Sequence, residues 1–140
     1  MEWTADAAPR EKPTIIVLDD DAAVRQSIKF SLELEGFTVR TYADAGELLN
    51  EMTLPPFGCL VIDYNLPALD GLEVLRQLRN RQVRLPAIMI TSYPSAMVRE
   101  RAAAAGASIV EKPMFNHALS DNIRAALEQE GWRSASKPPS

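Results

Sequence analysis

The sequence predicts an α/β domain in which a doubly wound, five-stranded parallel sheet is covered by helices on both faces. Three observations support this prediction. Short apolar segments alternate with helical patterns five times along the chain, which is typical of parallel strands joined by right-handed helical crossovers. The apolar segments are mostly continuous, as in strands buried on both faces. The length of 140 residues suits one domain with a substantial core.

The N-terminal part of the chain predicts a strand, a helix and a second strand. Residues 14–18 (TIIVL) are apolar and partly β-branched, so they predict a buried strand. Residues 22–35 predict a helix, because apolar residues recur there at a spacing of four. Gly36 follows this segment, as glycine commonly does at a helix C-terminus. Residues 37–42 (FTVRTY) predict the second strand.

The central part predicts two further helices around a third strand. The Asp-x-x-Glu motif at residues 44–47 is a capping box for a short helix that ends near Met52. Two prolines then interrupt the chain before the strand predicted at residues 58–62 (GCLVI). Residues 72–78 carry leucines in helical register and predict the third helix.

The C-terminal part completes the alternation. Residues 87–91 (AIMIT) predict the fourth strand. Ser95 is a suitable N-cap for an alanine-rich helix that ends at Gly106, and residues 108–111 predict the fifth strand. Asn116 is the expected cap of the last helix, in which apolar residues again recur every four positions.

Composition narrows the class of protein. Hydrophobic residues make up 46% and the net charge is -4, which argues against a nucleic-acid-binding surface. The single cysteine, Cys59, cannot form an internal disulfide, and no apolar segment approaches the roughly 20 residues of a membrane span. We therefore expect a cytoplasmic protein with no membrane contact. Residues 1–13 and 131–140 are polar and contain prolines, so we expect the first to be a flexible tail and the second a flexible tail or linker. The domain itself is expected at residues 14–130.

Polar side chains follow four of the predicted strands. They are, in chain order, Asp19 and Asp20, Asp63, Thr91, and Lys112. The carboxyl ends of parallel strands share one edge of a sheet, so we expect these groups to meet in one cleft. Carboxylates about 5 Å apart repel each other by roughly 3 kcal/mol at an effective dielectric near 20. Such a group favours a bound cation, and oxygen ligands suit Mg²⁺. An aspartate neutralised in this way can attack phosphorus.

These residues, in this order, resemble the signature of the receiver domain of two-component response regulators: Asp19-Asp20, Asp63, Thr91 and Lys112-Pro113. The resemblance covers about residues 14–130. It implies a flavodoxin-like fold with five helices and the strand order 2-1-3-4-5, which chemotaxis regulators also have. It further implies that the protein is a signalling switch, and that the only reactions it catalyses are its own phosphorylation and dephosphorylation.

The resemblance assigns the acidic residues to phosphorylation and metal binding. Asp63 would be the phosphoacceptor. Asp20 would bind Mg²⁺ directly, Asp19 would act largely through a bound water, and the backbone carbonyl of Asn65 would supply another ligand.

The resemblance also assigns the switch. Thr91 would hydrogen-bond the phosphoryl group, and the small Ser92 would leave room for its entry. Lys112 would pair with the phosphoryl group through its ammonium, and the Lys112–Pro113 bond would be cis. Tyr93 lies where side chains tune the access of water, and we expect its ring to slow loss of the phosphoryl group.

One position departs from the family pattern. Such receivers usually carry Tyr or Phe three positions before the lysine, whereas Ile109 stands there in this chain. The usual inward turn of an aromatic ring therefore cannot be carried over to this protein.

The expected phosphoryl donor is a sensor histidine kinase or a phosphotransfer protein. A downstream protein target is expected to bind the face formed by the fourth helix, fifth strand and fifth helix. A second copy of the chain is a further candidate partner. Two alternatives stay open. A Mg²⁺-dependent phosphohydrolase of the haloacid-dehalogenase type also uses an aspartate nucleophile at a strand end, but it carries Asp-x-Asp, and here Asn65 replaces the second acid. A receiver-like interaction module that is never phosphorylated is the other alternative, which Ile109 favours slightly.

Overall fold

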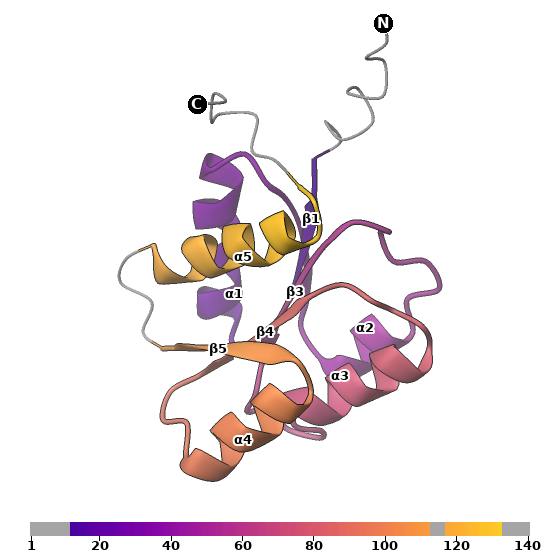
Figure 1. The fold of residues 1–140 in the computed structure, drawn as a ribbon, viewed down its shortest axis with the longest axis vertical. Coiled ribbons are helices and arrows are strands. Elements are labelled where there is room, and N and C mark those ends of the chain that lie inside the picture. The colour runs from indigo at the N-terminus through magenta and orange to yellow at the C-terminus, as the bar shows by residue number, and fades with distance from the viewer. Residues whose placement is uncertain (1–11, 113–116, 133–140) are drawn as a thin grey trace, which may run out of the picture.

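The computed structural model describes residues 12–112 and 117–132. Within these residues five strands and five helices alternate, and the strands form one parallel sheet in the order β2-β1-β3-β4-β5 (Figure 1). This architecture confirms the predicted fold class and strand order. The strands are β1 (Thr14–Leu18), β2 (Thr38–Tyr42), β3 (Gly58–Asp63), β4 (Ala87–Thr91) and β5 (Ala107–Glu111). The helices are α1 (Ala22–Leu34), α2 (Ala45–Leu49), α3 (Gly71–Asn80), α4 (Ala96–Ala104) and α5 (Ala118–Gln129).

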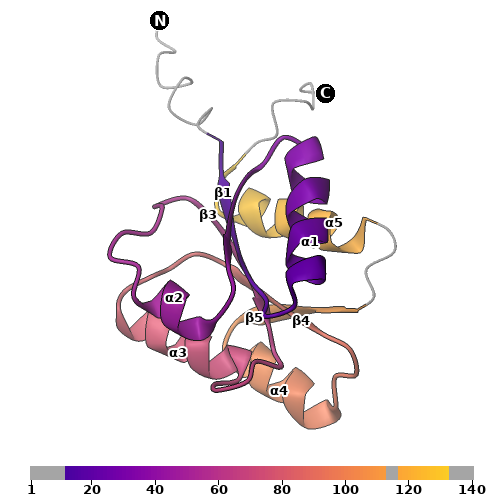
Figure 2. The same ribbon diagram turned by 180° about the vertical axis from the view of Figure 1, so that it is seen from behind.

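Helices cover both faces of the sheet. Helices α1 and α5 lie on one face, and α2, α3 and α4 lie on the other (Figures 1 and 2). Every residue of the central strands β3 and β4 is buried, which explains their continuous apolar sequences. The edge strands β2 and β5 each pair with one neighbouring strand only, and both contain exposed as well as buried residues.

Side-chain caps fix where four of the helices begin. Asp21, Asp44, Asp70 and Ser95 each accept a hydrogen bond from a backbone N–H in the first turn of the helix that follows. These caps satisfy amide groups that have no partner inside the helix. The predicted capping roles of Asp44 and Ser95 are therefore confirmed. Gly36 ends α1 with a φ of 97°, a left-handed conformation that glycine adopts without strain.

Several predicted boundaries differ from the structure, most of them by one residue, and the larger differences are the following. The helix expected to reach Met52 ends at Leu49, where the Arg81 guanidinium donates to the carbonyl oxygens of Leu49 and Glu51 at 2.8 and 2.7 Å. Helix α3 is longer than predicted and continues to Asn80. Strand β3 includes Asp63, which continues the pairing of β3 with β4.

Some predictions lie outside the described residues. These are the Lys112–Pro113 peptide bond and most of the two tails. Asn116 also lies outside the described residues, and the residue at the N-cap position of α5 is His117 instead of the predicted Asn116, with no side-chain cap hydrogen bond. At the C-terminal limit, the Trp132 ring packs against Phe37 with the ring centroids 6.1 Å apart. No helix among residues 12–112 and 117–132 is long and apolar enough to cross a membrane.

Candidate functional site

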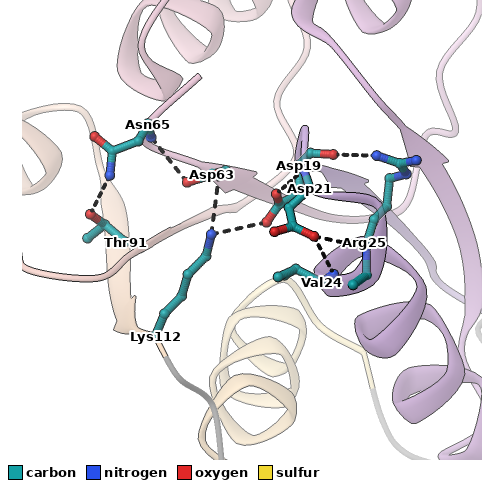
Figure 3. Close-up of polar contacts among 9 residues, drawn as sticks. Asp19, Asp21, Val24, Arg25, Asp63, Asn65, Thr91 and Lys112 are labelled. Atoms are coloured by element: carbon teal, nitrogen blue, oxygen red, sulfur yellow. Dashed lines mark hydrogen bonds and ion pairs between the residues drawn. The ribbon is translucent and has the colours of Figure 1, made fainter. Parts of the chain in front are cut away.

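The register of the sheet brings the predicted site residues together. Leu18 of β1 pairs with Ile62 of β3, so the next residues, Asp19 and Asp63, leave the two strands side by side. Lys112 follows β5, and its Nζ lies 3.3 Å from Asp19 Oδ2 and 3.3 Å from Asp63 Oδ2 (Figure 3). The cluster of side chains that the sequence predicts at the carboxyl edge is therefore present.

Three carboxylates form the acidic part of this cluster. Asp19 and Asp63 are buried, Asp20 is exposed, and one oxygen from each lies within 4.8 Å of the others. Asp19 Oδ2 is buried and accepts no hydrogen bond from the described residues, and the Lys112 ammonium at 3.3 Å is its ion-pair partner. An orphaned, buried carboxylate oxygen next to two more carboxylates is a donor set that suits a hard divalent cation. The residues present therefore fit Mg²⁺.

The electrostatics of the cluster set Asp63 apart. Burial, together with the Asp19 carboxylate, raises the pKa of Asp63 to about 6. The backbone N–H of Asn65 and the charge of Lys112 act in the opposite direction. Burial alone would lower the pKa of Lys112, but the charges of Asp63 and Asp19 outweigh it, so that this pKa is raised. The Lys112 ammonium therefore stays charged, and its positive charge offsets the negative charge of one of the two neighbouring carboxylates, Asp19 and Asp63.

Backbone contacts fix the orientation of Asp19. The N–H of Asp21 donates to Asp19 Oδ1 at 2.9 Å, which leaves Oδ2 directed at Lys112. Arg25 of α1 donates from Nη1 to the Asp19 carbonyl oxygen at 2.8 Å (Figure 3). Sequence reasoning did not assign Arg25 to the site. Its position on the second turn of α1, above an acidic strand end, is the signal that could have indicated it.

Asn65 links Asp63 to Thr91. Its backbone N–H donates to Asp63 Oδ1 at 3.1 Å, and its side-chain amide donates to Thr91 Oγ1 at 3.3 Å (Figure 3). Sequence reasoning predicted a role for the backbone of Asn65 and missed the role of its side chain. Thr91 is buried at the end of β4, and the N–H of Lys112 donates to its carbonyl oxygen at 2.9 Å.

The remaining predicted residues surround this cluster. Ser92 is half-buried and directly follows Thr91. The Tyr93 side chain is 94% exposed, so its ring does not cover the site in this conformation. Ile109 is half-buried and packs against the core on the α2–α4 side of the sheet. Its aliphatic side chain has no polar atom that could contact Thr91.

The parallel sheet with an acidic cluster, a hydroxyl and a lysine at its carboxyl edge has the arrangement expected from the resemblance to receiver domains, and the comparisons with known proteins agree on this class. Residues 15–128 match the family described as response regulator receiver domain. The chain belongs to this family. A receiver domain is a signalling switch, so the family assignment decides against the phosphohydrolase alternative.

Individual relatives support the assignment. The chain is 35% identical over 119 residues to the transcriptional regulatory protein FixJ of Bradyrhizobium diazoefficiens, covering 84% of this chain and 58% of that protein. It is 37% identical over 123 residues to the C4-dicarboxylate transport transcriptional regulatory protein DctD of Pseudomonas aeruginosa, covering 86% of this chain and 27% of that one. The chain therefore spans less than two thirds of the length of each of these relatives.

Solved structures show the same fold. The crystal structure of FixJ-N is similar with a TM-score of 0.77 at 31% identity, covering 84% of this chain and 95% of that one. The chemotaxis protein CheY4 of Vibrio cholerae is similar with a TM-score of 0.77 at 25% identity, covering 83% and 99% of the two chains.

Proposed function

We propose that this receiver domain takes a phosphoryl group onto Asp63 from a phosphohistidine of a sensor kinase or phosphotransfer protein. The observation that carries the proposal is the placement of one ammonium, Lys112 Nζ, 3.3 Å from the carboxylates of both Asp63 and Asp19. This arrangement is suited to receiving negative charge. The family assignment supports the same reaction class.

The residues of the cluster divide the chemistry between them. An oxygen of Asp63 attacks phosphorus, the bond from phosphorus to the histidine nitrogen breaks, and that nitrogen keeps the electron pair. Lys112 stabilises charge on the oxygens of the transferring group, and Thr91 is placed to donate a hydrogen bond to it. Asp19, Asp20, Asp63 and the Asn65 carbonyl would hold Mg²⁺, which would neutralise charge on the phosphoryl oxygens.

Phosphorylation then alters the surface that partners bind. A phosphoryl group adds roughly -1.5 to -2 charges to the site, and we expect Thr91 to move toward it so that its hydroxyl hydrogen, which the bond from the Asn65 amide does not use, can donate to it. Since Thr91 leads into the segment before α4, the two arrangements favour different positions of the α4–β5–α5 face. We propose that this face binds a downstream protein or a second copy of the chain in one arrangement, by a shift of populations. A cytoplasmic location and a functional unit at residues 14–130 belong to the same proposal.

Intact mass spectrometry tests the proposal. The protein is incubated with acetyl phosphate and Mg²⁺, with EDTA in place of Mg²⁺ as one control and Asp63→Ala as the other. We expect one added phosphoryl group that is lost in both controls and is labile to hydroxylamine, as an acyl phosphate is. A wild-type chain that stays unmodified with acetyl phosphate and with a panel of histidine kinases would favour the interaction module that is never phosphorylated. An unchanged modification of Asp63→Ala would assign the acceptor elsewhere.

A further inference from the structure

We propose that Arg101, on α4, is a positioning residue that couples this helix to the loop carrying Asn65. The proposal rests on the proposed function, and it names the route by which the Asp63 site and the α4 surface communicate. Ile109 gives this chain no aromatic ring for that purpose. The contacts of Arg101 supply a route that does not depend on Ile109.

Arg101 reaches across from α4 to both ends of the loop after the acceptor. Its Nη1 donates to the Tyr64 hydroxyl oxygen at 3.0 Å, and its Nη2 lies 3.5 Å from Asp70 Oδ2. Tyr64 directly follows Asp63, and Asp70 is the N-cap of α3. Helix α4 accordingly lies beside the start of α3 in both views of the ribbon (Figures 1 and 2).

The loop side of this contact is firmly held. The backbone N–H of Tyr64 donates to the Ile90 carbonyl oxygen at 2.9 Å, and the Tyr64 carbonyl accepts from Gly71 N–H at 2.9 Å. The Tyr64 ring packs against the core on the α2–α4 side of the sheet. Asp70 Oδ1 accepts from Glu73 N–H at 2.8 Å. A displacement of the Arg101 contact is therefore transmitted to the backbone on both sides of Asn65.

The helix side is weakly held. Within α4, whose residues are all described, Val98 and Ala102 are the buried side chains. Outside this small apolar contact, Arg99 pairs with Glu111 of β5 at 2.7 Å, and Arg101 makes the contacts to the loop. A helix with so little buried surface depends on its polar contacts for its position.

Coupling between two sites is reciprocal. If the Arg101 contacts exist in one arrangement of α4 and are weakened in the other, phosphorylation of Asp63 shifts α4, and a partner bound to α4 shifts the acceptor loop. The Arg101 and Asp70 side chains are 43% and 35% exposed. For exposed polar contacts of this kind we expect an effect of about two- to fivefold on an equilibrium.

Hydrogen exchange of the full chain, followed by mass spectrometry, tests the coupling. Three variants are compared with the wild type: Arg101→Met, Tyr64→Phe and the matched control Arg99→Met. We expect Tyr64→Phe to raise the exchange of α4 amides about two- to fivefold, although no atom of α4 has changed. We expect Arg101→Met to raise exchange in both α4 and residues 64–70. Arg99→Met should affect α4 and leave residues 64–70 as in the wild type.

A double variant separates a direct contact from general loosening. With Arg101 already replaced by Met, the Tyr64→Phe change should add nothing to the exchange of α4, because the hydroxyl has lost its partner. Additive effects in the double variant, or an unchanged α4 in Tyr64→Phe, would overturn the proposal.

The same samples treated with acetyl phosphate and Mg²⁺ connect the contact with the switch. We expect phosphorylation to change α4 exchange in the wild type and in Arg99→Met, and to change it at least twofold less in Arg101→Met at equal phosphoryl content. An equal response in Arg101→Met would refute the coupling while leaving the proposed function intact. A wild type that gains no phosphoryl mass would refute the proposed function, and the untreated samples would still decide whether Arg101 joins the helix to the loop.

Discussion

The side-chain amide of Asn65 donates a hydrogen bond to the Thr91 hydroxyl oxygen at 3.3 Å, so this hydroxyl is engaged by the loop that follows Asp63. In this arrangement Thr91 does not contact Asp63 through a described hydrogen bond. The Thr91 oxygen accepts in this bond and keeps its own hydrogen to donate, but the bond holds Thr91 in its present position and is weakened if the residue moves toward a phosphoryl group on Asp63.

Replacing Asn65 by Ala should therefore favour the phosphoryl-bound arrangement. A neutral hydrogen bond contributes roughly 0.5–1.5 kcal/mol net, so we expect half-saturation by beryllofluoride, a phosphoryl mimic, at about two- to tenfold lower concentration. The measurement is a titration with Mg²⁺ present. Thr91→Ala serves as the control, since it removes the hydroxyl itself and should weaken binding. Weaker binding by Asn65→Ala would show that the amide assists the bound state.

Asp63 should destabilise the metal-free protein when it is ionised. Its pKa is raised from 3.8 to about 6, so the folded state holds this proton more tightly than the unfolded state does. Stability therefore falls as the pH rises from about 4 to about 6, and the cost persists above that range. In EDTA at pH 7, we expect Asp63→Asn to raise the free energy of unfolding by on the order of 1–3 kcal/mol.

Denaturant unfolding at several pH values checks this expectation. The advantage of Asp63→Asn should shrink below pH 5, where the wild-type carboxyl becomes protonated, and it should also shrink when Mg²⁺ is added. A variant less stable than the wild type at pH 7 in EDTA would mean that the ion pair with Lys112 outweighs the crowding of the carboxylates.

Gly71 should not tolerate a side chain. A Cβ added there would lie 2.6 Å from the backbone oxygen of Asp63 and 3.0 Å from Met89 Sδ. We expect Gly71→Ala to lose about 1–3 kcal/mol, as overpacked sites do. Gly46→Ala is the matched control near the start of α2, because its nearest neighbour is the Asp44 side chain at 3.2 Å. Thermal unfolding of both variants makes the comparison, and equal midpoints would contradict the predicted clash.

Cys59 should report unfolding. Burial raises the pKa of its thiol to about 12, and the side chain is fully buried in β3. The thiolate is the reactive species, so we expect iodoacetamide to label the native protein at pH 8 only through opening of the sheet. Labelling should increase steeply across the urea transition. Rapid labelling of the native protein would show that β3 is accessible without global unfolding.

The parts of this structure that the sequence predicts are those governed by local pattern. The strands and most helices follow from apolar spacing and from caps such as Ser95. The site residues follow from a topological rule, since Asp19, Asp63, Thr91 and Lys112 all stand at strand ends of a parallel sheet.

The parts that escaped prediction depend on contacts between distant segments. Arg81 donates to the carbonyl oxygen of Leu49, the last residue of α2, although it lies 32 residues further along the chain. Arg101 of α4 donates to the Tyr64 hydroxyl oxygen in the loop after β3. The direction of the Asn65 amide is set by the position of Thr91, which lies 26 residues further along the chain. Spacing along one chain segment carries no information about such pairs, because it does not specify which loop faces which helix.

The close packing at Gly71 leaves little room for Asp63 to move toward α3, whereas the side facing α4 is less tightly packed. Helix α3 begins at Gly71, where even an added Cβ would lie 2.6 Å from the backbone oxygen of Asp63 and 3.0 Å from Met89 Sδ, so little space separates Asp63 from this helix. Helix α4 buries only the Val98 and Ala102 side chains, so we expect it to move more easily. If Asp63 is phosphorylated as we propose, we therefore expect the added charge to displace α4 rather than α3, so that the packing of the core determines which surface responds.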